Sequence, residues 1–106
     1  TMFTLLQKDE AHLKKILHLA STNDPSFLML FKETYPDFYK KLNAINPGLI
    51  AGEQKLCAFL KLDLSTKEIA QYTNSSIRAV EAKKYRLRKK LSITSEEDIN
   101  VWMMNL

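Results

Sequence analysis

Glycine and proline are scarce in this chain, and their scarcity limits how often the chain can turn. Only 2 glycines and 3 prolines occur among 106 residues, so long stretches lack any residue that breaks a helix. Many of these stretches carry apolar residues three and four positions apart, which is typical of amphipathic helices. A many-stranded sheet would need more turns than these residues provide. The sequence therefore predicts an all-α fold.

The breaks that do occur divide the chain into a series of predicted helices. The strongest linker signal is Asn46-Pro47-Gly48, which separates an N-terminal helical extension, 1–48, from a C-terminal domain, 49–106. We expect helices over residues 3–20, from Pro25 (with Asp24 as its cap) to Tyr35, around Phe38–Ile45, from about Ala51 to Lys61, from Ser65 to Tyr72, from Ser76 to Leu91, and from Thr94 through Ile99 to the chain end.

Two short segments have the pattern of a capping box, which marks a helix start. In Ser65-Thr66-Lys67-Glu68 the serine hydroxyl can accept the amide of the glutamate, whose carboxylate can accept the amide of the serine. The same pattern in Thr94-Ser95-Glu96-Glu97 predicts the start of the last helix. Between them, Thr73-Asn74-Ser75 predicts a tight turn, because asparagine tolerates the left-handed conformation, and Ser76 can cap the helix that follows.

Positive charge is concentrated in one predicted helix. The net charge is +4, but the stretch 78–90 holds seven basic residues and one acid, Glu81, and so carries +6. The other residues therefore sum to −2. Taken alone, a basic helix face is as consistent with simple solvation as with a polyanionic partner. Its position after a capped helix and a tight turn favours nucleic acid as the partner, because a capped helix, a tight turn and a basic helix together form a helix-turn-helix.

The predicted recognition helix, about 76–91, has an apolar face and a face that suits the major groove of DNA. Ala70 is small enough for the preceding helix to cross closely, while Val80, Leu87 and Leu91 are expected to point inward. Exposed side chains in the first turns of such a helix meet base edges. The candidates for base contact are Arg78, Glu81, Ala82 and Tyr85.

Some of these roles have alternatives, and a second set of residues is placed for the DNA backbone. Tyr85 can instead stack on a sugar or pack at the domain surface. Glu81 can accept a hydrogen bond from cytosine, and Ala82 can contact a thymine methyl. Contacts to phosphate hold the protein in register without reading sequence. The candidates for phosphate contact are Thr66, Lys67, Ser76, Lys83, Lys84, Arg86, Arg88 and Lys89.

The C-terminal half resembles the LuxR/NarL/GerE type of bacterial transcription regulator. The resemblance rests on residues 65–70 (STKEIA), 76–81 (SIRAVE) and 86–91 (RLRKKL), and it covers roughly residues 49 to 106. It implies a four-helix domain whose second and third helices bind double-stranded DNA. It also implies a homodimer formed through the fourth helix, here by Trp102, Met103 and Leu106, with RNA polymerase as a further partner. Ile50, Ser75, Lys83 and Ser92 depart from the family pattern.

Other readings of the same residues remain open. The helix-turn-helix also suits the promoter-reading domain of a sigma factor. Alternatively, an all-helical interaction module would dock an acidic protein on the basic face. Trp102, Met103 and Leu106 are either core or dimer seam. Residues 1–48 can supply a coiled-coil or dimerising lead-in through Leu6, Leu13 and Leu17, although Glu10 lies on that stripe.

The sequence offers little for catalysis, metals or membranes. Cys57 is expected in the core, and His12 and His18 are six residues apart, on different helix faces, so we expect no metal site, cofactor or enzyme activity. The aromatic cluster around Phe27, Phe31 and Phe38 is also expected in the core. Because the chain begins at Thr1, we expect a piece of a longer protein, lying in the cytoplasm with no membrane contact of its own, as at the end of a membrane-bound sensor.

Overall fold

Seven helices and no strand make up the described part of the chain. A computed structural model describes residues 2–106, with side chains from Ala11 onward, so Leu6 and Glu10 of the predicted coiled-coil stripe lie outside the described side chains. The helices are α1 (Met2–Ser21), α2 (Phe27–Thr34), α3 (Pro36–Ile45), α4 (Ala51–Lys61), α5 (Thr66–Tyr72), α6 (Ile77–Leu91) and α7 (Ile99–Met104). The predicted all-α class is confirmed.

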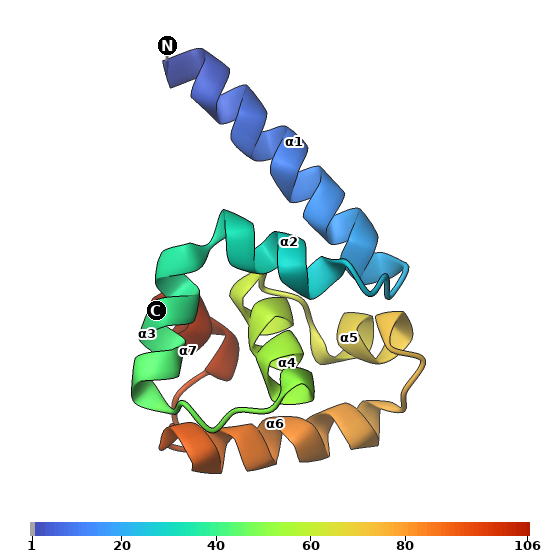
Figure 1. Cartoon of the computed structure of the whole chain (residues 1–106). Coiled ribbons are helices and arrows are strands. Elements are labelled where there is room, and N and C mark those ends of the chain that lie inside the picture. Colours follow the sequence, from blue (N-terminus) through green and yellow to red (C-terminus); the bar gives the residue numbers. More distant parts are fainter. Residues whose placement is uncertain (1) are drawn as a thin grey trace.

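Helix α4 lies at the centre of the bundle, with the other helices around it (Figure 1). Five consecutive residues, Leu56 to Leu60, are buried. A helix at the surface buries only one stripe, so burial on every side requires that α4 be surrounded. Helix α6 runs along one edge of the bundle, and the N-terminal part of α1 extends away from the bundle on the other side (Figure 1).

One continuous core crosses the predicted boundary between residues 48 and 49. Its buried side chains include Phe27 and Phe31 from α2 and Phe59 from α4. The rings of Phe27 and Phe59 stack with their centroids 4.9 Å apart, and those of Phe27 and Phe31 lie 6.0 Å apart. Ile16 and Ala20, at the end of α1, belong to the same cluster. The aromatic residues were expected in a core, and the structure shows that both parts of the chain share it.

The predicted start of the last helix is wrong. Thr94–Glu97 forms a turn in which the Glu97 amide donates to the Thr94 carbonyl at 3.2 Å, and α7 begins only at Ile99. The Asp98 carboxylate accepts the amides of Asn100 (2.8 Å) and Val101 (3.2 Å), so Asp98 is the cap. Glu97 does accept the Thr94 amide, at 3.2 Å, which is half of the predicted box. The start of α2 also lies later than predicted, at Phe27, while Asp24 accepts the amide of Ser26 at 2.8 Å.

Ser92 ends α6 in a left-handed conformation, with φ 57° and ψ 38°. A side chain strains this conformation, and glycine relieves the strain. We expect Ser92→Gly to raise the free energy of unfolding by about 0.5–1 kcal/mol, measured by urea denaturation. The control is Ser95→Gly, also at an exposed turn but outside the positive-φ residues. Ser95→Gly should lower the free energy of unfolding by about as much as Ser92→Gly raises it. An equal loss of stability in both variants would contradict the strain at Ser92.

Candidate nucleic-acid interface

Helix α5 begins with the capping box that the sequence predicted. The Ser65 hydroxyl accepts the amide of Glu68 at 3.1 Å, and the Glu68 carboxylate accepts the amide of Ser65 at 3.0 Å. Two amides of the first turn are thereby satisfied without tertiary contacts. Ala70, on the inward side of α5, is buried, as expected for the residue at a close helix crossing.

The turn between α5 and α6 has the predicted geometry. Asn74 adopts a left-handed conformation with φ 51°, and the Ser75 amide donates to the carbonyl of Ala70 at 2.8 Å. Ser76 then caps α6, because its hydroxyl accepts the amide of Ala79 at 3.0 Å. Each of these bonds joins residues close in sequence, so the residues of the turn set the direction in which α6 leaves it without tertiary contacts.

Helix α6 has one buried face and one exposed face. Val80, Leu87 and Leu91 are buried, as predicted. The four residues predicted to contact bases all lie on the exposed side, and Tyr85 is 59% exposed. They are Arg78, Glu81, Ala82 and Tyr85. The ammonium group of Lys89 lies 4.7 Å from the centroid of the Tyr85 ring, a cation–π distance that holds two side chains of this face together.

The eight residues predicted to contact phosphate divide into two groups. Lys67, Ser76, Lys83, Arg86 and Lys89 are exposed. The other three have side chains bonded to other elements of the protein, whereas the Ser76 hydroxyl caps its own helix. The ammonium group of Lys84 donates to the hydroxyl of Thr66 at 2.7 Å, which joins α6 to the start of α5. Burial at this contact lowers the pKa of Lys84. One guanidinium nitrogen of Arg88 donates to the carbonyls of Thr94 (2.9 Å) and Glu97 (2.7 Å).

The C-terminal end of α6 is bound to the first turn of α4 and to the segment that precedes it. Lys90 forms an ion pair with Glu53 at 2.7 Å. The Asn46 side-chain amide donates to the carbonyl of Lys90 at 3.2 Å, and Glu53 also accepts the amide of Ile50 at 3.1 Å. Burial raises the pKa of Glu53, but the Lys90 ammonium and the Ile50 amide outweigh burial, so the pKa lies below its ordinary value. Sequence reasoning had missed this pair, which neutralises one charge of the basic stretch.

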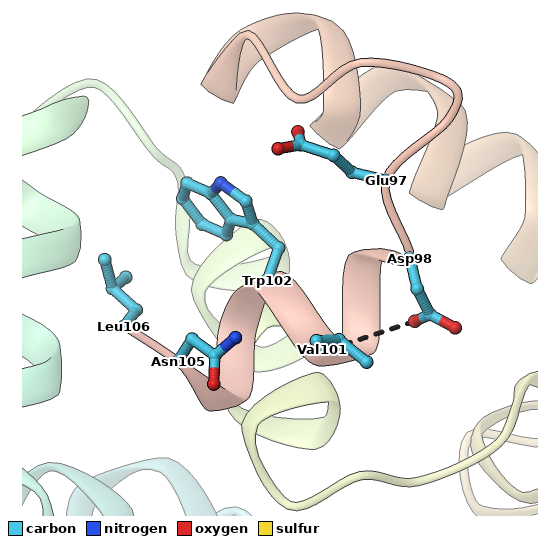
Figure 2. A pocket seen from close by; sticks show the side chains of 6 residues that line it. All are labelled: Glu97, Asp98, Val101, Trp102, Asn105 and Leu106. Atoms are coloured by element: carbon cyan, nitrogen blue, oxygen red, sulfur yellow. Dashed lines mark hydrogen bonds between the residues drawn. The ribbon is translucent and has the colours of Figure 1, made fainter.

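The residues predicted to form a dimer seam differ in exposure. Met103 is fully buried in the core of its own chain, so it has no surface for a partner, and that part of the prediction needs correction. Trp102 and Leu106 are half-buried and line a surface pocket of about 470 Å³ on one side of α7, beside Glu97 (Figure 2). Val101 is more exposed than either. Sequence periodicity placed Met103 on the same stripe as Trp102 and could not rank their burial.

No cluster of three or more metal-ligating side chains occurs among the described residues. His12 and His18 are exposed on α1, and Cys57 is buried in α4, where burial raises its pKa to about 12. None of the described helices combines the length and the apolar character needed to cross a membrane. Comparison with protein-family models, curated proteins and solved structures found no match for the chain.

Proposed function

We propose that the chain binds double-stranded DNA in a sequence-specific manner as part of a transcription regulator, with α6 in the major groove. The observation that carries the proposal is the exposed stripe Arg78, Glu81, Ala82 and Tyr85 on a helix whose other face is core. The major groove admits one α-helix, and a helix can enter it only if the side facing the bases is uncovered.

The charges around the stripe support the same proposal. Lys83, Arg86 and Lys89 are exposed on α6, and Lys67 is exposed at the start of α5. Cationic side chains beside a base-reading face neutralise phosphates and release counterions, which supplies much of the affinity. In this proposal the main role of Thr66, Lys84 and Arg88 is structural rather than phosphate contact. Their hydrogen bonds hold α5, α6 and the 94–97 turn in place.

The resemblance to LuxR-type regulators extends the proposal to assembly. Helices α4 to α7 would be the four helices of that domain, and two copies would associate through α7. Trp102 and Leu106 would form the contact, with Val101 and Met104 in place of Met103, because both are exposed. RNA polymerase as a further partner and a place in the cytoplasm belong to the same proposal.

The test compares two double variants that each remove two positive charges. A duplex site is first selected from random DNA, and its affinity is then measured by fluorescence anisotropy across a salt series. We expect Arg78→Ala with Lys89→Ala to weaken binding about 10- to 1,000-fold and to reduce the salt slope by about 1. The charges removed lie on the exposed face of α6.

The matched control is Lys14→Ala with Lys15→Ala. Both lysines are exposed on α1, at the opposite side of the bundle from α6 (Figure 1). This control should leave the salt slope nearly unchanged. Equal losses in the two double variants would mean that binding follows net charge alone, and unchanged affinity in the α6 variant would remove α6 from the interface.

A further inference from the structure

Two adjoining hollows lie at the first turns of α4, whose start is close to α6 (Figure 1). One faces the flank of α6, and the other also reaches α5 and the turn before α6. Their volumes are about 180 and 200 Å³, and they share Gly52, Leu56 and Lys83. We call them together the α4–α6 groove. The residues used below to define it are Ile50, Gly52, Leu56, Phe59, Lys83 and Arg86.

Two residues at the groove break the local rules for starting a helix. Ile50 is at the N-cap of α4, where its side chain can accept no hydrogen bond, and it is 66% exposed. A serine or aspartate there typically favours the folded state about five-fold. Gly52 lies within the first turn of α4, where alanine would be more favourable. A Cβ at Gly52 would meet no atom within 4 Å, so packing inside the chain does not require glycine.

Both departures lie at the same surface. Ile50 presents an apolar side chain at the edge of the groove, and Gly52 leaves the backbone of α4 open to close approach from outside. Leu56 and Phe59, both almost fully buried, form the apolar floor of the groove. Residues that lower local stability without an internal reason are expected at functional sites. An apolar side chain of a partner would fill the space over Gly52.

The charged rim of the groove favours an anionic occupant. Lys83 and Arg86 are exposed, and neither forms a close ion pair with any residue whose side chain the structure describes. The one acid on the rim, Glu53, is paired with Lys90 at 2.7 Å, and the charge of Arg86 also acts on it without a close ion pair. Bare phosphates would match the cations but would leave Ile50 and the apolar part of the groove uncovered, whereas a protein segment can satisfy both.

We propose that the α4–α6 groove docks an acidic peptide segment of a partner protein. One apolar side chain of that segment is seated over Gly52, and its flanking carboxylates lie on Lys83 and Arg86. These two cations are also proposed phosphate contacts, so docking excludes DNA from this flank of α6. The exclusion of DNA by the docked peptide rests on the proposed function, whereas the docking of the peptide does not.

The experiment selects peptides from a random phage-displayed library on the wild-type chain, with counter-selection on Gly52→Leu. A Cβ at this exposed helical position meets no atom within 4 Å, so we expect leucine to be accommodated and to occupy the groove. A urea titration verifies folding. We expect the selected peptides to share one apolar residue flanked by Asp and Glu. A synthetic copy should bind Gly52→Leu at least about ten-fold more weakly than wild type. The matched control, Ala11→Leu on the exposed side of α1, should bind as wild type does.

Several results would overturn the proposal. Selection that yields no peptide sensitive to Gly52→Leu would do so, and so would a consensus without acids or without an apolar residue. A Gly52→Leu variant that loses duplex DNA and keeps the peptide would assign the groove to the DNA interface instead. If the peptide binds the groove but wild type binds no duplex, docking stands and the proposed function fails. Competition between peptide and duplex supports both.

Discussion

Replacing Phe27 by alanine is expected to lower the free energy of unfolding by about 3–5 kcal/mol. The Phe27 side chain is fully buried, and its ring stacks on Phe59 of the central helix α4. Its removal leaves a cavity between α2 and α4 in addition to the lost transfer free energy. Since small domains have only about 5–15 kcal/mol of stability, the variant should lose a large fraction of it in a urea titration.

The same variant tests whether the first 48 residues fold together with the rest. Because the core is continuous from α1 to α7, hydrogen exchange should show that amides of α5 and α6 lose protection together with those of α2. The control is Met29→Ala, on the same helix but 64% exposed, which should change stability by less than about 0.5 kcal/mol. Loss of protection confined to α2 would mean that residues 1–48 are a separate extension.

The second large effect is expected at α7. Met103→Ala should destabilise the chain by about 2–5 kcal/mol, because Met103 is fully buried in the core shared with α4. Stability is measured by urea denaturation at two protein concentrations at least about 100-fold apart. A core residue lowers stability at both concentrations alike, whereas a dimer contact matters more at the higher one.

Met104→Ala is the control for this prediction. Met104 neighbours Met103 in α7 but is 37% exposed, so its replacement should cost less than about 1 kcal/mol of monomer stability. If α7 mediates the proposed dimer, this variant and Val101→Ala should instead weaken self-association in sedimentation equilibrium. If Met103→Ala lowered stability mainly at the higher protein concentration and little in the monomer, Met103 would be a dimer contact after all.

Local chemistry explains what the sequence could predict. The capping box at Ser65 and Glu68, the left-handed Asn74 and the Ser76 cap all depend on residues at most a few positions apart, and each is found as predicted. Helical periodicity likewise identified the buried face of α6. The all-α class, the limits of α5 and α6, and the exposure of the proposed base-reading stripe could therefore be predicted without tertiary contacts.

Competition and long-range contacts explain what the sequence could not predict. Both Thr94–Glu97 and Asp98 can start a helix, and Asp98 caps α7 while Arg88 binds the carbonyls of the preceding turn. Lys90 meets Glu53 across 37 positions, and Lys84 meets Thr66 across 18. Long cationic side chains reach several neighbours, so their partners depend on how the helices cross.

The burial of Cys57 has a consequence for chemistry under oxidising conditions. Its pKa of about 12 leaves almost no thiolate at neutral pH, and the side chain has no exposed surface. Oxidants and alkylating reagents need an accessible thiolate, so they act only after α4 separates from its neighbours. The rate at which such a reagent consumes the lone thiol therefore measures how often the centre of the bundle opens.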